Sequence, residues 1–88
     1  MKVITIKVAL NGVVGLATDY KSAVAFLIKE RWLTIFEDVE NEEGYFESIG
    51  ENLGLDWEET LLSWDIQKFN EYFGGGYTLE EMEVFEAK

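Results

Sequence analysis

The chain has 88 residues, of which 48% are hydrophobic and 15% aromatic. This length fits one small domain with a single core, and this composition excludes an intrinsically disordered chain, in which high charge accompanies low hydrophobicity. The chain contains no cysteine and no histidine, which excludes disulfides, thiolate metal sites and histidine-based catalysis. We therefore expect one compact domain over residues 1–88, without a metal or cofactor.

The negative charge is concentrated in the middle of the chain. The net charge is −11, and residues 32–67 hold eleven Asp and Glu but no Lys or Arg. The remaining residues hold seven acids and seven bases, so residues 32–67, the acidic segment, carry the entire net charge. A field of this sign repels nucleic acid and anionic lipid and attracts basic surfaces.

The first eighteen residues predict a β-hairpin. β-branched residues dominate positions 3–8, and Asn11-Gly12 is the dipeptide that favours a two-residue type I′ turn. Residues 13–17 then form the returning strand. Gly15, inside that strand, indicates a bulge or a close approach of the backbone.

A helical pattern follows the hairpin. Thr18 or Asp19 can cap the helix, and apolar residues then recur at helical spacing. The predicted buried face comprises Tyr20, Ala23, Val24 and Leu27, with Arg31 as a further candidate.

Residues 33–42 are compatible with either helix or strand. Trp32, Ile35, Phe36 and Val39 keep helical spacing, while Ile35, Phe36 and Val39 together with Thr34 also suit a short strand. We favour a loop or an irregular extension here.

Two further helices are expected between residues 43 and 73. Residues 43–53 form a short helix ended by Gly54, and a longer helix begins at Asp56, where Glu59 completes a capping box. Its apolar stripe comprises Leu62, Ile66, Phe69 and Phe73. This helix has a possible break at residues 63–65, and the three glycines at 74–76 end it.

The last segment, residues 78–86, is also open to two interpretations. Thr78 with Glu81 resembles a capping box, whereas the alternation of apolar Met82 and Val84 with charged neighbours favours a strand. We favour a strand that joins the N-terminal hairpin. The predicted fold is α+β, a small antiparallel sheet of hairpin plus C-terminal strand packed with about three helices in the order ββαααβ.

Catalysis and metal binding find little support in the residue pattern. The serines have no candidate base, and every carboxylate pair stands among like charges. No register of the acidic segment fits a calcium loop, and the 74–76 glycines follow a helix rather than opening one. We expect a protein that is not an enzyme and has no dedicated metal site.

The acidic segment suggests binding to a basic partner. On a helix, Glu43, Glu47 and Glu51 would form an outward ridge with carboxylates about 6 Å apart, although like charges at this spacing oppose helix formation. Such a ridge could stand in for a nucleic-acid backbone. The predicted partner-binding residues are Glu40, Glu42, Glu43, Glu47, Glu51, Glu58 and Glu59, with Tyr45, Trp57 and Trp64 as apolar anchors.

The expected partner is a basic protein that itself binds nucleic acid; no direct contact of this chain with nucleic acid is expected. In size and charge the chain resembles small acidic inhibitors of phages and mobile elements, such as anti-CRISPR proteins, antirestriction proteins and DNA mimics. The resemblance involves no motif, so it assigns a role to no residue. It implies a non-enzymatic inhibitor.

Other interpretations remain open. The acids could be only a solvated face that aids solubility, while the chain docks through apolar contacts as a structural or regulatory subunit. A small metal- or ligand-binding module is a third possibility. The sequence has no apolar run long enough to span a membrane and no signal-peptide pattern, so we expect a cytoplasmic protein, either monomeric or a homodimer through a sheet edge.

Overall fold

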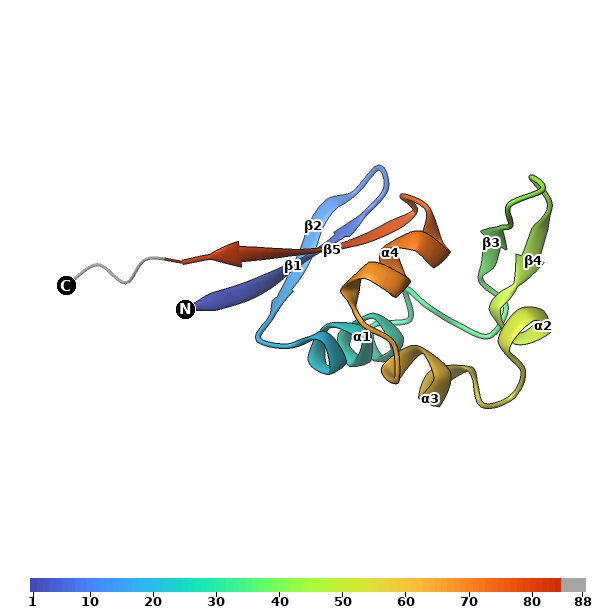
Figure 1. Ribbon diagram of the computed structural model, residues 1–88, viewed down its shortest axis with the longest axis horizontal. Helices are drawn as coiled ribbons and strands as arrows, with labels where there is room; N and C mark the ends of the chain where they lie inside the picture. The colour runs from blue at the N-terminus through green and yellow to red at the C-terminus, as the bar shows by residue number, and fades with distance from the viewer. Residues whose placement is uncertain (85–88) are drawn as a thin grey trace.

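The computed structural model describes residues 1–84, which form a three-stranded sheet, a two-stranded sheet and four helices (Figure 1). The elements in chain order are β1 (Lys2–Val8), β2 (Gly12–Ala17), α1 (Tyr20–Lys29), β3 (Asp38–Glu40), β4 (Phe46–Ser48), α2 (Ile49–Leu53), α3 (Trp57–Leu62), α4 (Ile66–Phe73) and β5 (Tyr77–Glu83). The α+β class and the predicted sheet are therefore confirmed.

The larger sheet has the strand order β2-β1-β5, and both pairings are antiparallel. Ile4, Ile6 and Val8 of β1 point into the core, and Ile6 lies opposite Leu79 of β5. The C-terminal segment is thus a strand, and the alternative capping box at its start is not formed. Residues 85 and 86 of the predicted strand lie outside the described residues.

The turn between β1 and β2 differs from the prediction. Val8 pairs with Gly12, so three residues connect the strands instead of two. The N–H of Asn11 donates to the carbonyl oxygen of Val8 at 3.0 Å, and the positive φ angles fall on Leu10 and Gly12. A type I′ turn needs positive φ at Asn11 and Gly12, so the prediction of a two-residue turn was wrong.

Gly15 fulfils both of its predicted roles. The β1–β2 register shifts next to it, because Ile6 lies opposite Gly15 while Lys7 lies opposite Val13. A Cβ atom at Gly15 would stand 2.9 Å from the ring of Phe26 on α1. The missing side chain therefore lets α1 approach the sheet closely.

Asp19 is the residue that caps α1. Its carboxylate accepts a hydrogen bond from the Ser22 N–H at 2.7 Å, and this bond lowers the pKa of the Asp19 carboxyl. Ala23, Val24 and Leu27 are buried as predicted, whereas Arg31 lies beyond the helix and is exposed.

Residues 43–48 do not form the predicted helix. Asn41 folds this stretch into a hairpin, because its side-chain oxygen accepts hydrogen bonds from the N–H groups of Glu43 and Tyr45, both at 3.0 Å. Gly44 takes the positive φ that the turn requires. The helix begins only at Ile49, and the preceding ambiguous stretch contributes the short strand β3 instead of a loop alone.

The long helix is interrupted at the predicted position. α3 ends before Ser63, whose hydroxyl donates to the Thr60 carbonyl at 2.7 Å. Asp65 caps α4 by accepting from the Lys68 N–H at 2.8 Å. Asp56, in contrast, makes no capping hydrogen bond, so the capping box predicted there was wrong.

A single core joins the sheet to the helices. Phe69 of α4 is fully buried, and its ring packs edge-on against Tyr20 and tilted against Phe73. The side chain of Asn70 pairs with the backbone of Leu79, donating to its carbonyl oxygen and accepting from its N–H, both at 2.9 Å. Asn70 thereby occupies part of the outer edge of β5.

Candidate partner-binding surface

The acidic segment builds one side of the molecule. β3, β4 and α2 lie at the end opposite the chain termini, and α3 leads from there back beneath α4 (Figure 1). α2 contacts both β4 and α3, so the hairpin acids and the α3 acids belong to adjoining elements. The predicted carboxylates thus lie on adjoining elements, the β3–β4 hairpin, α2 and α3, which we call the acidic side.

The β3–β4 hairpin carries the outermost carboxylates. Glu40, Glu42 and Glu43 are exposed, and none of these side chains hydrogen-bonds within residues 1–84. Glu47 on β4 is half-buried and accepts a hydrogen bond from the Asn41 amide at 3.4 Å. Three free carboxylates therefore surround the tip of the hairpin.

The evenly spaced ridge does not exist. Glu43 lies in the hairpin turn, Glu47 in β4 and Glu51 in α2, so the three do not share one helical face. The Glu51 carboxylate accepts a hydrogen bond from the Ser48 hydroxyl at 3.0 Å, and the Glu51 N–H donates to the same hydroxyl at 3.1 Å, so that Ser48 caps α2. The carboxylates therefore do not have the regular spacing that would resemble a phosphate backbone, although their negative charge remains.

Two more carboxylates stand on the first turn of α3. Glu58 and Glu59 are both exposed. Carboxylates at this position interact favourably with the N-terminal end of the helix dipole. These two acids therefore have a structural role in addition to any role in binding.

The ion pairs of the described residues lie along β1 and β5 of the larger sheet, outside the acidic segment. Lys7 pairs with Glu80 at 3.2 Å, Lys2 with Glu81 at 4.0 Å, and the N-terminal amine with Glu83 at 3.0 Å. Within residues 1–84, no carboxylate of the acidic segment forms an ion pair. The carboxylates of this side are therefore not ion-paired within the described residues, although Lys68 lines a hollow with Glu40 and Glu42, and Arg31 lines one with Glu58.

The three predicted aromatic anchors differ in their accessibility. Tyr45, at the hairpin, is 67% exposed, whereas Trp57 is 7% exposed and belongs to the core. Trp64 is partly buried, packs edge-on against Tyr72 at 5.0 Å and has the Lys68 ammonium 5.5 Å from its ring. Tyr45 is thus the predicted anchor whose ring is open to a partner.

Two exposed phenylalanines were not predicted as anchors. Phe36 is 82% and Phe46 67% exposed. The helix predicted over residues 43–53 would place Phe46 on the same face as Ile49, but residue 46 lies in the strand β4 and its side chain is exposed. No local signal in the sequence indicates these exposures, because they depend on the β3–β4 hairpin.

Two shallow hollows adjoin Phe36. One, of about 470 Å³, is lined by Ile28, Leu33, Ile35, Phe36, Trp57 and Glu58, together with Thr34 and Arg31. The other, of about 310 Å³, is lined by Ile35, Phe36, Ser48, Gly50 and Glu51. Ile35 and Phe36 belong to both, so apolar surface and carboxylates meet here.

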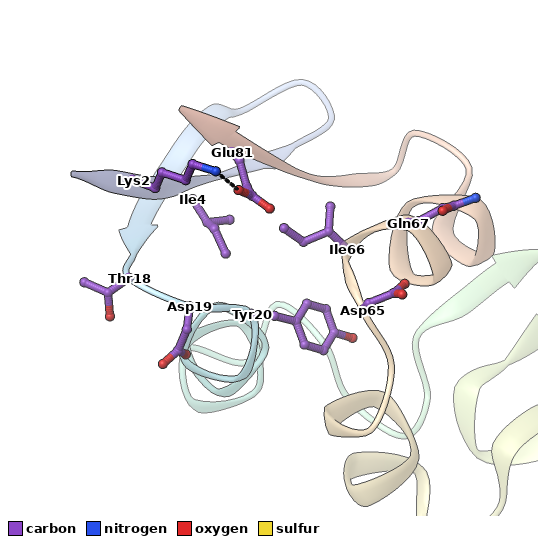
Figure 2. Close-up of a pocket in the computed structure, with 9 residues that line it drawn as sticks. All are labelled: Lys2, Ile4, Thr18, Asp19, Tyr20, Asp65, Ile66, Gln67 and Glu81. Carbon is purple, nitrogen blue, oxygen red and sulfur yellow. Dashed lines mark ion pairs between the residues drawn. The ribbon is translucent and has the colours of Figure 1, made fainter. Parts of the chain in front are cut away.

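A further hollow, of about 610 Å³, lies between the larger sheet and the starts of α1 and α4 (Figure 2). Its carboxylates are already engaged: Asp19 and Asp65 cap the two helices, and Glu81 pairs with Lys2. The hydroxyl of Tyr20 donates to the Leu61 carbonyl oxygen at 2.5 Å. The carboxylates and the phenol of this hollow therefore take part in contacts that hold the fold together.

Among residues 1–84, no helix is long and apolar enough to cross a membrane, and no group of three or more Asp and Glu could hold a metal ion. Comparisons with protein-family models, with curated proteins and with solved structures find no match to this chain.

Proposed function

We propose that this chain is a non-enzymatic binding protein whose acidic side occupies a basic surface of a partner protein. One observation carries the proposal: eleven carboxylates come from one stretch without a base, and none of them is ion-paired within the described residues. A folded protein gains little from such a concentration, because like charges repel. A basic partner would remove this repulsion.

The hairpin tip is the proposed centre of the contact. Glu40, Glu42 and Glu43 are exposed there beside Tyr45. Exposed carboxylates steer a basic partner and set orientation, and a large aromatic ring supplies buried contact area. The two kinds of residue together would give both a fast encounter and a defined docked position.

The proposed partner is a nucleic-acid-binding protein. Proteins of this class carry concentrated Lys and Arg for phosphate contacts, which makes them the natural complement of a surface with this charge. The chain would then compete with nucleic acid, as an inhibitor in the cytoplasm of the type of the anti-CRISPR and antirestriction proteins that it resembles in size and charge. The chain could compete with nucleic acid through its negative electrostatic field alone, and this competition does not require carboxylates with the regular spacing of a phosphate backbone.

Capture experiments test this proposal. The tagged chain would be used to retain proteins from a lysate of its source organism, with elution by rising salt and, separately, by duplex DNA. We expect a basic partner that salt releases, because screening weakens exposed charge contacts, and that DNA displaces. A partner that stays bound at high salt and in excess DNA would show that the proposal is wrong.

A second candidate function rests on the open face of the larger sheet. α1 and α4 cover one face, while Val13, Leu16 and Met82 are exposed on the other. This face could dock a structural partner or a second copy, with the acids only solubilising. Sedimentation of the wild type and of Leu16→Lys would reveal such a homodimer, because the lysine would abolish it.

A further inference from the structure

The turn that carries Phe36 has a fixed shape. The N–H of Phe36 donates to the Thr34 hydroxyl at 3.3 Å, and the N–H of Glu37 donates to the Thr34 carbonyl at 3.1 Å. The ring is nevertheless 82% exposed. Its exposure therefore results from an ordered turn.

α2 holds the same turn from the other side. The N–H of Gly50 donates to the Ile35 carbonyl and the N–H of Ile49 to the Glu37 carbonyl, both at 2.9 Å. A Cβ atom at Gly50 would overlap the Ile35 Cγ1 atom and stand 3.1 Å from the Ile35 carbonyl oxygen, so glycine is needed for this approach. Phe36 is thus held before any partner arrives, which reduces the entropy lost on binding.

The two hollows beside Phe36 are apolar at the centre and acidic at the rim. We name them together the Phe36 site, formed chiefly by Ile28, Ile35, Phe36, Trp57, Glu51 and Glu58. Arg31 is the basic residue that lines this site among the described residues, and it stands on the α1 side, in the hollow with Glu58. The α2 and α3 sides therefore present carboxylates.

We propose that the Phe36 site binds an aliphatic side chain of a lysine- or arginine-rich segment of the partner protein. The apolar lining suits an aliphatic side chain such as that of leucine, and the exposed carboxylates Glu51 and Glu58 suit cationic neighbours on either side of it. This inference rests on the proposed function, because it assumes a basic partner. It adds a site that the count of charges could not indicate.

Apolar contact and charge would contribute differently to binding. Salt screens the interaction of exposed carboxylates with lysine, whereas burial of a leucine side chain is not weakened by screening. A segment with Asp or Glu beside the leucine would be repelled by Glu51 and Glu58. The site would therefore select basic apolar segments over acidic ones and over purely basic ones.

Two peptides of equal charge test the inference: acetyl-Lys-Lys-Leu-Lys-Lys-amide and the same peptide with Ser in place of Leu. Each is titrated into the isotopically labelled chain, and amide and indole NMR signals are followed. We expect both peptides to shift signals of the acidic side. The Leu peptide should bind roughly ten-fold more tightly and should alone shift Ile35, Gly50 and the Trp57 indole.

Phe36→Ser and Phe46→Ser form a matched pair of variants, because both replace an exposed phenylalanine on the same side of the molecule. Phe36→Ser should reduce the preference for the Leu peptide to about one, and Phe46→Ser should leave it unchanged. The NMR spectrum of each variant verifies that it is folded.

The outcomes separate the two proposals. Equal binding of both peptides at the acidic side, or a Leu preference that survives Phe36→Ser, overturns the Phe36 site but leaves the proposed function standing. Binding of neither peptide, or binding of both outside the acidic side, overturns both. A Leu preference lost in Phe36→Ser and kept in Phe46→Ser supports both.

Discussion

The backbone N–H of Gly50 donates to the carbonyl oxygen of Ile35 at 2.9 Å, so α2 and the turn before β3 form one corner of the structure. This contact brings together the strand, the helix and the exposed Phe36 of the acidic side. It requires a residue without a side chain, since a Cβ atom would overlap the Ile35 Cγ1 atom and would also stand 3.1 Å from the Ile35 carbonyl oxygen.

Gly50→Ala should therefore destabilise the protein. The added methyl group would overlap the Ile35 side chain and press on the Ile35 carbonyl oxygen, and overpacking of this kind costs about 1–3 kcal/mol. The gain in helix propensity, about 1 kcal/mol at most, offsets only part of it. Urea unfolding measures the loss, and Gly76→Ala, where a Cβ atom would stand 3.6 Å from the Phe73 carbonyl oxygen, should change stability by less than about 0.5 kcal/mol. Equal stability of Gly50→Ala and wild type would contradict the close contact.

Asn70→Ala should destabilise the protein, because it leaves part of the β5 edge without hydrogen-bond partners. The Asn70 amide satisfies both backbone groups of Leu79, and removing it leaves a partly buried donor and acceptor without partners. We expect a loss of about 1–3 kcal/mol in the free energy of unfolding. Gln67→Ala, on the exposed face of the same helix, is the control and should cost less than about 0.5 kcal/mol. A similar small effect of both changes would mean that Asn70 does not hold β5.

Asp65 and Asp56 precede consecutive helices but differ in their hydrogen bonds. Asp65 accepts from the Lys68 N–H, whereas Asp56 makes no capping bond. Asp65→Ala should cost about 1 kcal/mol, and Asp56→Ala about 0.5 kcal/mol or less, since only the helix dipole loses a favourable charge. Thermal unfolding of both variants measures the two losses of stability. The reverse order would favour one continuous helix with its cap at Asp56.

The half-buried Tyr20 and the buried Tyr77 should make the protein less stable at alkaline pH. Burial, and secondarily Asp65, raises the pKa of Tyr20 above its usual 10.0. Burial, followed by Glu37, raises the pKa of Tyr77, whose hydroxyl lies 2.7 Å from the Trp32 carbonyl oxygen and 3.0 Å from the Glu37 carboxylate. Folding therefore favours the protonated phenols.

This contribution to stability is fully present below pH 10, where both states are protonated, and is lost as pH rises further, because the unfolded state releases its protons first. Urea unfolding at about pH 8 and about pH 11 should show the loss. Tyr77→Phe should be less stable at the lower pH but fall less between the two. An equally steep fall in Tyr77→Phe would assign the loss to other groups.

Much of the fold could be predicted because its signals are local. The alternation of β-branched residues gave the strands of the hairpin, and the positions of Ala23, Val24 and Leu27 gave the buried face of α1. Gly15 was informative because only close packing or a bulge explains a glycine inside a strand. The break before α4 was visible in Asp65, which is a good cap and a poor residue for a helix interior.

The prediction of a helix was wrong for residues 43–48. Glu43 and Glu47 have helical spacing, but Asn41 and Gly44 form a turn whose hydrogen bonds involve side chain and backbone together. The repulsion between like charges four residues apart also opposes the helix. Local periodicity could not weigh these effects against one another.

The candidate site was only partly predictable. Counting charges identified the acidic side, because charge is a property of composition and position. The burial of Trp57 and the exposure of Phe36 depend on which elements cover them, which is decided by tertiary contacts such as that between Gly50 and Ile35. No spacing rule along the chain encodes such contacts.

The central claim is that the position of the acids matters, and not only their number. Glu40→Lys/Glu42→Lys/Glu43→Lys reverses the charge at the hairpin tip, while Glu30→Lys/Glu81→Lys/Glu83→Lys makes the same change at exposed positions outside the acidic segment. Each triple variant moves the net charge from −11 to about −5. The affected ion pairs of Glu81 and Glu83 are exposed, so their loss should cost at most about 1 kcal/mol each.

The most direct measurement is the affinity of the two triple variants for the purified captured partner, side by side at low salt. We expect the hairpin variant to bind roughly ten-fold or more weakly than wild type and the matched variant to stay within about two-fold. Equal weakening of both variants would mean that only net charge attracts the partner. Undiminished binding of the hairpin variant would contradict the acidic side as the binding surface.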